Sequence, residues 1–358
     1  MWKKQVGCVW GILLAVTISG CSSTELEQRS FPLAVGIDAG ENLVVSFDFP
    51  DLAQISEKGK TTDTAMGLSL EGADMYHVEK SYENNTNRVL DYNHMKAVVL
   101  GENIFTDTEK LRGLLLSWEQ REESARNTSL LMGKESAAEI LSLTEETEGS
   151  MGTYLEEMLE SQQDFRQGKI ATMGNLMNQW HNQNELLLIP VLTEKGNRPV
   201  ITEYAAVLNF RYKGTFTVEE AMEVFLCQNL LKKFTCESVK NEVVEISDIR
   251  VSKSITLEGR QPVVAVSVQG TGRLKTGQMN SASEQYQLEK NIEKQLLADL
   301  METAERMRQD YGIDMTNSYV SLGGENRDLY YLYKNRADDY NRDVQQIFQV
   351  DISLANWE

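Results

Sequence analysis

Short apolar runs alternate with amphipathic segments along the first half of the chain. Residues 32–38 and 43–49 are apolar runs joined by a turn sequence at 39–42, and together they predict a β-hairpin. Residues 94–100 predict a further strand, which Gly101 ends. Amphipathic spacing predicts helices at residues 68–83, 111–123, 136–143, 151–159 and 170–181. This half of the chain therefore mixes strands with helices.

A polar stretch rich in breakers divides this pattern in two. The apolar strand expected at 186–192 contains Pro190, and proline predicts an edge position or a bulge because it has no amide hydrogen to donate. Residues 194–199 (EKGNRP) follow, and they are the best candidate for a domain boundary. We therefore expect an N-terminal α+β region over 31–195, built from two subdomains, and a C-terminal α+β domain over 200–358.

The strand and helix pattern restarts in the C-terminal half. Strands are predicted at residues 204–212, 243–251, 262–274 and 348–354. Residues 213–214 (KG) predict a turn, and the capping box at 217–220 opens a helix. The longest helix, about 283–311, carries an apolar residue every three or four positions up to Gly312. Hairpin strands with helices between them predict an α+β fold with antiparallel or mixed sheets flanked by helices.

The first residues of the chain have the layout of a secretory signal. Lys3 and Lys4 precede an uncharged apolar core at 6–18, and small residues stand directly before Cys21. This core is too short to span a membrane comfortably. A cysteine at the cleavage position is typical of a bacterial lipoprotein signal. We therefore expect residues 1–20 to be removed and Cys21 to carry a diacylglyceryl group.

Lipidation of Cys21 would hold the mature protein at a membrane, outside the cytoplasm. Two acyl chains give stable anchoring without a protein span. Residues 21–30 then form a short polar tether. Two other interpretations are a secreted protein without lipid and a short core helix that ends in cysteine. The charge pattern around the apolar core argues against both.

Composition excludes several classes of partner and restricts the cysteine chemistry. The 358-residue chain has a formal charge of −19, which argues against nucleic-acid binding and against broad docking onto anionic lipid headgroups. After removal of the leader, only Cys227 and Cys236 remain besides Cys21, too few for a disulfide framework. Cys227 lies beside an apolar helical stripe, so we expect a buried thiol. A bridge to Cys236 stays open as an alternative.

The sequence contains no recognisable catalytic constellation. Its histidines, His77, His94 and His181, are too far apart for a helical metal pair. A Gly-x-Ser-x-Gly elbow is also missing, although a spatial triad or a pair of carboxylates remains formally open. We therefore assign no catalytic, cofactor-binding or metal-binding residue and expect a protein that is not an enzyme.

The order and spacing of several landmarks resemble one known family. After Cys21 come a strand that ends in Gly-Ile-Asp at 36–38 and a strand that ends in Gly-Glu at 94–102. Further along come the segment 205–210, with its turn and capped helix, and Tyr-Gly-Ile-Asp at 311–314. Over essentially the whole mature chain, this arrangement is similar to the Ger(x)C spore germination lipoproteins, the C subunits of nutrient germinant receptors.

The resemblance implies a three-domain α+β body on the outer side of the spore inner membrane. It implies assembly with a membrane-embedded A subunit and a permease-like B subunit, needed for germination, and no catalytic activity or cofactor. Two other functions are weighed against it. A solute-binding lipoprotein would need two lobes of parallel strands with a cleft between them. A surface-anchored cell-wall hydrolase would need two carboxylates facing each other across a cleft.

Overall fold

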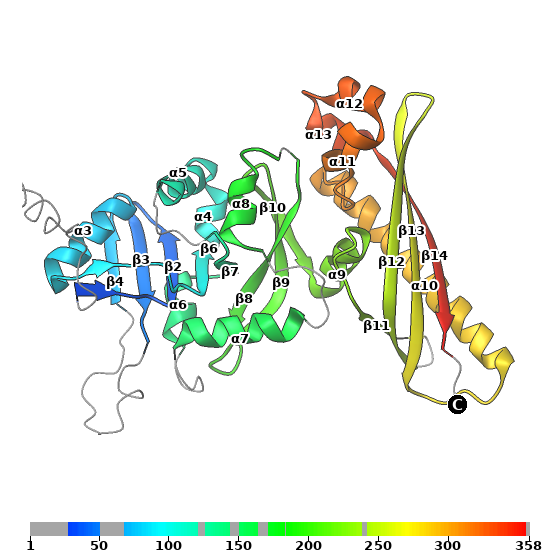
Figure 1. Cartoon of the computed structure of the whole chain (residues 1–358), viewed down its shortest axis with the longest axis horizontal. Helices are drawn as coiled ribbons and strands as arrows, with labels where there is room; N and C mark the ends of the chain where they lie inside the picture. The colour runs from blue at the N-terminus through cyan, green and yellow to red at the C-terminus, as the bar shows by residue number, and fades with distance from the viewer. Residues whose placement is uncertain are drawn as a thin grey trace, which may run out of the picture.

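The chain folds into an elongated body with two main β-sheets and, among the described residues, a third sheet of two short strands (Figure 1). The structure is a computed structural model, and it describes residues 28–50, 68–120, 126–143, 150–163, 171–182, 184–237 and 242–355. A larger sheet occupies the N-terminal end of the body, and a smaller sheet with a long helix occupies the C-terminal end. The predicted α+β class with mixed sheets flanked by helices is confirmed.

The larger sheet has eight strands in the order β10-β9-β8-β7-β6-β2-β3-β4. Its strands are β2 (Ala34–Ala39), β3 (Leu43–Asp48), β4 (Leu68–Gly72), β6 (Ala97–Gly101), β7 (Ser129–Gly133), β8 (Leu187–Glu194), β9 (Pro199–Leu208) and β10 (Arg211–Thr217). The four central strands, β2, β6, β7 and β8, run parallel, and antiparallel strands extend the sheet on both sides. The predicted hairpin of β2 and β3 is confirmed.

Helices cover both faces of the larger sheet, which explains the continuous apolar runs of its central strands. The helices are α3 (Met75–Thr86), α4 (Glu102–Thr106), α5 (Thr108–Glu119), α6 (Ala137–Ser142), α7 (Met151–Gln163) and α8 (Met173–Asn178). In β6, Val98 and Leu100 pack into the core with α3, α5 and α8, whereas Ala97 and Val99 face the core formed with α6 and α7. A short parallel pair, β1 (Arg29–Ser30) and β5 (Val89–Leu90), lies beside this sheet.

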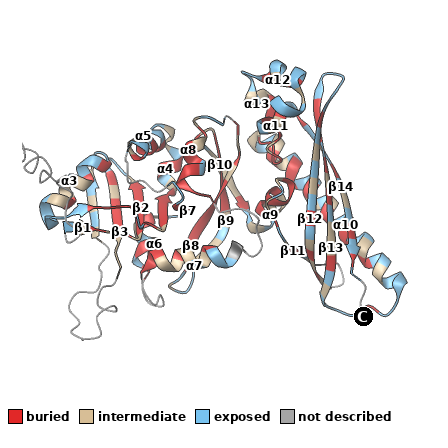
Figure 2. Ribbon diagram, in the orientation of Figure 1, coloured by how far each residue is buried: buried red, intermediate tan, exposed pale blue. Residues whose placement is uncertain are grey.

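The smaller sheet has the order β11-β12-β13-β14 and packs against one long helix. Its strands are β11 (Phe234–Glu237), β12 (Val243–Glu258), β13 (Gln261–Thr276) and β14 (Gln345–Leu354), and its helices are α9 (Val218–Cys227), α10 (Ala282–Tyr311), α11 (Ser318–Glu325), α12 (Arg327–Tyr333) and α13 (Ala337–Asp343). The predicted stripe of α10 is buried from Leu288 to Met307, and Gly312 ends the helix in the left-handed conformation. Figure 2 shows that the β12–β13 hairpin, unlike the larger sheet, leaves many positions exposed.

Two sequence-based assignments in the larger sheet are wrong in part. The segment 68–83 was expected to be helical throughout, but its first five residues form β4 and pair with β3. Pro190 was expected at an edge or a bulge, yet β8 lies inside the sheet between β7 and β9. Pro190 is tolerated there because the pairing with β7 begins only at Val191, next to a register shift against β9.

The predicted turn after β9 is misplaced. Leu208 pairs with Arg211, so the chain turns at Asn209 and Phe210, both with positive φ, as a two-residue hairpin requires. Gly214, which the sequence placed in the turn, instead marks a register shift within β10. The turn therefore lies four residues earlier than the sequence suggested.

The boundary expected at 194–199 coincides with the turn between β8 and β9. Both strands belong to the larger sheet, which continues to Thr217. The chain passes to the smaller sheet through α9 and the segment before β11, because Phe234 is the first residue that pairs with β12. The larger sheet therefore extends about twenty residues beyond the polar stretch at 194–199.

Candidate functional site: the joint between the two sheets

The residue expected to carry the lipid, Cys21, lies outside the described residues, together with the leader and most of the tether. Lipidation therefore stays a prediction. Among the helices within the described residues, none is both long enough and apolar enough to cross a membrane.

The two remaining cysteines are free thiols in the described part of the chain. Cys227, at the end of α9, is fully buried, as its position beside the apolar stripe predicted. Cys236 lies in β11 and is partly buried. Burial raises the pKa of Cys236 to about 12 and raises the pKa of Cys227 further, so both groups stay protonated at neutral pH. Neither thiol has the lowered pKa that a nucleophilic cysteine needs.

The three histidines lie apart on the surface. His77 packs against Asp74 at the start of α3, and its ring nitrogen lies 2.8 Å from the Asp74 carboxylate. His94, just before β6, and His181, after α8, are exposed elsewhere around the larger sheet. Across the described ranges, we find no group of three or more histidine, cysteine or acidic side chains that could hold a metal ion.

Asp38 and Gly101, two of the landmark residues, lock the larger sheet to α6. The Asp38 carboxylate accepts hydrogen bonds from the Ala137 and Ala138 amides at 2.9 and 3.0 Å and from the Ser136 hydroxyl at 3.0 Å. It thereby satisfies amides that the first turn of a helix leaves without a partner. A Cβ atom on Gly101 would lie 2.1 Å from Asp38 Oδ1, so only glycine fits there. Asp38 and Gly101 therefore stabilise the packing of α6 on the larger sheet.

A buried pair of asparagines joins the larger sheet to the helical end of the smaller domain. Asn184 stands just before β8, and Asn341 lies in α13. Their side chains exchange two hydrogen bonds, with Asn184 Nδ2 donating at 2.6 Å and Asn341 Nδ2 donating at 2.8 Å. Both residues are almost fully buried, with exposed fractions of 3% and 1%. Two amides that satisfy each other away from water fix one relative position of the two elements.

A second asparagine contact lies next to this pair. Asn317 Oδ1 accepts from the Leu186 amide at 2.7 Å, and Asn317 Nδ2 donates to the Leu186 carbonyl at 3.2 Å. Asn317 therefore pairs both backbone groups of Leu186, the residue directly before β8, as a neighbouring strand would. We call the set of Asn184, Leu186, Asn317 and Asn341 the asparagine joint.

A buried carboxylate orders the segment that carries Asn317. The oxygens of Asp314 accept from the amides and hydroxyls of Thr316 and Ser318, at distances between 2.5 and 2.9 Å. Ser318 also bonds the hydroxyl of Tyr340 at 2.8 Å, and burial raises the pKa of that phenol. The landmark Tyr-Gly-Ile-Asp at 311–314 therefore ends the long helix and holds the backbone that presents Asn317 to β8.

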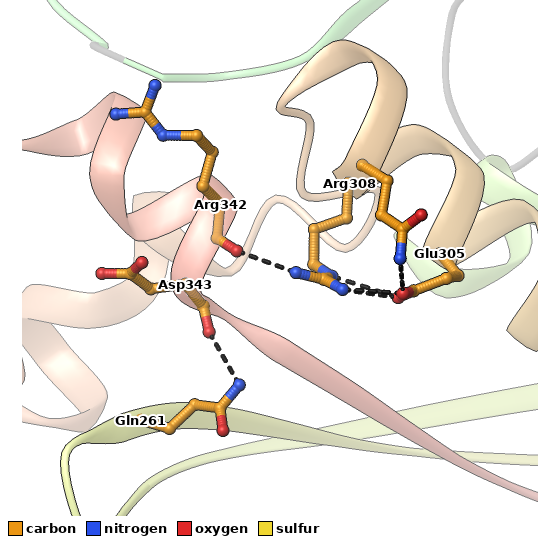
Figure 3. Close-up of polar contacts among 6 residues, drawn as sticks. Gln261, Glu305, Arg308, Arg342 and Asp343 are labelled. Atoms are coloured by element: carbon orange, nitrogen blue, oxygen red, sulfur yellow. Dashed lines mark hydrogen bonds and ion pairs between the residues drawn. The ribbon is translucent and has the colours of Figure 1, made fainter.

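A polar brace fixes the same helical end to α10 and to the sheet (Figure 3). Arg308 on α10 pairs with Glu305 at 2.8 Å and donates to the Arg342 carbonyl at 3.0 Å. Gln261, at the start of β13, donates to the Asp343 carbonyl at 3.3 Å. The position of α13, and with it Asn341, therefore depends on both α10 and β13. A displacement of the smaller sheet would reach β8 through these contacts.

The composition and patterning of the sequence did not reveal the asparagine joint. Its partners are 131 and 157 residues apart in the chain, and asparagine is also common in turns. Asn184 and Asn317 both adopt positive φ, which favours asparagine over most other residues, but this conformation is visible only in the structure. It explains why each asparagine suits its backbone, and it does not show the partner.

Comparison with known families decides the assignment. The model of the spore germination protein N-terminal domain matches residues 22–194, and the model of the spore germination B3/GerAC-like C-terminal domain matches residues 203–355. This chain belongs to the Ger(x)C family of spore germination proteins. The two Ger(x)C models meet at the β8–β9 turn, although the larger sheet continues across it.

A solved structure supports the same fold for this Ger(x)C protein. The structure described as the crystal structure of the GerBC protein superposes with a TM-score of 0.61 at 15% sequence identity. The match covers 90% of this chain and 97% of that chain. A comparison with curated proteins finds no match. The likeness to GerBC shows a shared fold over nearly the whole length of both chains.

Proposed function

We propose that this protein is the lipid-anchored C subunit of a nutrient germinant receptor in the spore inner membrane. It acts by assembly and not by catalysis, and its partners are the integral membrane A and B subunits. The observation that carries the proposal is the pair of family matches over residues 22–194 and 203–355. The lipoprotein pattern that ends at Cys21 supports the mode of attachment.

The described structure is consistent with an assembly role. Three residues that carry the family resemblance have structural roles. Asp38 and Asp314 accept hydrogen bonds from nearby backbone amides, and Gly101 packs against Asp38, so none of the three is needed to line a cleft. The two sheets share an apolar core, and the fully paired asparagine joint adds a directional polar contact that can carry a change of position from one part to the other. A subunit that relays a signal by contact needs a defined relation between its two ends.

The attachment is tested with Cys21→Ala, expressed at the native locus in spores. We expect loss of labelling by a fatty-acid analogue, release of the protein from the membrane fraction and a reduced germination rate on nutrients. Cys8→Ala is the matched control, because Cys8 lies in the leader and should change none of the three readouts. Normal germination of Cys21→Ala spores, in a strain without a second receptor for the same nutrient, would refute the proposal.

Assembly is tested separately by purifying the tagged protein from spore membranes. The A and B subunits should be recovered with it from wild-type spores. Recovery of the protein alone from intact membranes, under conditions in which the A and B subunits remain together, would argue against a receptor subunit.

A solute-binding lipoprotein is the second candidate, because the larger sheet has a parallel core. Such proteins are built from two parallel lobes. Here β13 and β14 are parallel, whereas the other pairings in the described smaller sheet are antiparallel. The smaller sheet is thus mainly antiparallel and is no second parallel lobe, and the receptor assignment explains the whole chain better. Uptake of a radiolabelled solute that depends on this gene would restore the second candidate.

A further inference from the structure

A cavity of about 480 Å³ lies where the chain passes from the larger sheet to the smaller one. Its walls come from α9, β11 and α10, so it is bounded by the connecting helix, the first strand of the smaller sheet and the long helix. The volume falls within the range of roughly 300–1,000 Å³ that is usual for small-molecule sites. The cavity therefore has room for an organic molecule.

The walls of the cavity are largely apolar. Met222 and Leu226 contribute from α9, Phe234 from β11, and Ile292 and Leu296 from α10. Burial of a hydrocarbon body against these side chains would contribute roughly 25 cal/mol for each Å² removed from water. The apolar lining selects a ligand with a hydrophobic body over a sugar or a free phosphate.

The charged residues on the described cavity wall are all acidic. They are Glu219, Glu223, Glu237 and Asp299. An uncompensated set of carboxylates beside an apolar wall attracts cations and repels anions. The electrostatics of the cavity therefore specify a positive charge on the ligand.

Among the acidic residues of the cavity wall, Glu223 has a buried carboxylate oxygen without a hydrogen-bond partner in the described part of the chain. This atom is Oε2, and the side chain also bonds Thr303. Burial and the nearby carboxylates of Asp299, Glu220 and Glu302 raise the pKa of Glu223 to about 7. An ionised carboxylate in this setting is costly unless a donor or a cation pairs with it. An ammonium group supplies both.

We propose that this cavity binds a small primary amine with an apolar body, whose ammonium group pairs with Glu223. The hydrocarbon body lies between Leu226 on α9, Phe234 on β11 and Leu296 on α10. Rotation of the carboxylate about its last bond, which is a soft torsion, brings either oxygen to the ammonium group. The binding is non-covalent and needs no co-reactant.

A ligand in this position would connect the two halves of the protein. Helix α9 follows directly from β10 of the larger sheet, whereas β11 and α10 belong to the smaller sheet and its core. A molecule that contacts all three reduces their relative freedom, and binding to the folded state raises stability. The inference does not rest on the proposed function, because it is measured on the purified chain.

The test uses the purified full-length protein in phospholipid nanodiscs and three probes with one shared body. Phenethylamine is the cation, phenethyl alcohol is the neutral analogue and hydrocinnamate is the anion. Binding is measured by ligand-observed nuclear magnetic resonance and by isothermal titration calorimetry. We expect the amine to bind about tenfold more tightly than the alcohol or better, as a charge-assisted pair implies, and the anion not to bind.

Three variants separate this site from general adsorption. Glu223→Gln should abolish the preference for the amine over the alcohol, and Met222→Trp should weaken binding of both because it fills the cavity. The matched control is Asp310→Asn, which removes one negative charge from an exposed position on α10 that neither lines the cavity nor contributes to the raised pKa of Glu223. Thermal unfolding confirms that each variant is folded.

Two results would overturn the inference. The first is the absence of saturable binding by the amine to the folded wild-type protein. The second is an unchanged ratio of amine to alcohol affinity in folded Glu223→Gln. A loss of amine binding in Asp310→Asn as large as that in Glu223→Gln would equally contradict it, because it would show a diffuse effect of charge.

Discussion

The asparagine joint makes a quantitative prediction about how the two domains are held. Asn341→Leu keeps the number of side-chain heavy atoms and removes both hydrogen bonds to Asn184. After the change, Asn184 Nδ2 retains a contact of 3.3 Å with the Ala337 carbonyl, whereas Asn184 Oδ1 loses the Asn341 donor. The perturbation therefore leaves a buried acceptor without this partner.

The magnitude follows from the burial of both residues. A buried polar group that loses its partner costs about 1–3 kcal/mol, and the lost pair contributed about 1 kcal/mol more. We expect the free energy of unfolding to fall by about 2–4 kcal/mol. Asn184→Gly preserves the positive φ of that position at little backbone strain and should be costly as well. In the double variant, the two losses should fall short of additivity by about 1–2 kcal/mol, because they share one interaction.

Urea unfolding followed by circular dichroism measures these free energies. Hydrogen exchange locates the change, because the Leu186 amide donates to Asn317 and should exchange faster when the joint loosens. Asn291→Leu is the matched control: it makes the same chemical change on an exposed face of α10, and we expect less than about 0.5 kcal/mol. Strict additivity of Asn341→Leu and Asn184→Gly, with unchanged exchange at Leu186, would refute the reasoning.

Three further predictions follow from the described contacts. Gly101→Ala places a Cβ atom 2.1 Å from Asp38 Oδ1 and should lower the free energy of unfolding by about 3 kcal/mol; an unchanged melting temperature would contradict this. Glu223 has a raised pKa of about 7 in the folded protein, so the folded state binds a proton more tightly than the unfolded state. The free energy of unfolding therefore falls as pH rises from about 4.5 through 7. Glu223→Gln should therefore be more stable than wild type at pH 8, by about 1–2 kcal/mol after allowance for solvent screening, and should show no gain near pH 4; a constant difference across this range would refute the assignment. Thr217→Ala removes one half of the capping box that opens α9 and should cost about 1 kcal/mol in urea unfolding, whereas a cost near zero would show that the cap is dispensable.

Local signals predicted many of the elements, because they act within a few residues. The capping box at Thr217 and Glu220 is confirmed in both of its hydrogen bonds. At Ser281 and Glu284, which have the same spacing, only one of the two hydrogen bonds of a capping box forms, since the Glu284 carboxylate accepts from the Asn280 amide instead of the Ser281 amide. The spacing of apolar residues predicted the long helix and its buried face, and Gly312 predicted the end of the helix.

Errors arose where a residue type has more than one structural use. Gly214 suggested a turn, but two non-glycine residues, Asn209 and Phe210, adopt the positive φ of the hairpin and leave the glycine at a bulge. Pro190 suggested an edge strand or a bulge; β8 lies inside the sheet, but its pairing with β7 begins just beyond Pro190 and a register shift against β9 follows at Val191 and Leu192. Apolar residues from 68 to 83 suited a helix by spacing, and the strand at Leu68–Gly72 forms because β3 offers a free edge. In each instance the neighbouring strand decided the outcome.

The sequence by itself determined the class of fold, the long C-terminal helix, the lipoprotein pattern at Cys21 and the family resemblance, because each is written in neighbouring residues or in their order. Only the tertiary structure decided that one sheet crosses the expected domain boundary, and that Asn184 meets Asn341 across 157 residues. It also decided that Glu223 lies beside an apolar cavity. The physical reason is that hydrogen-bond partners and burial are properties of packing, and the same asparagine or glutamate would be an ordinary surface residue elsewhere.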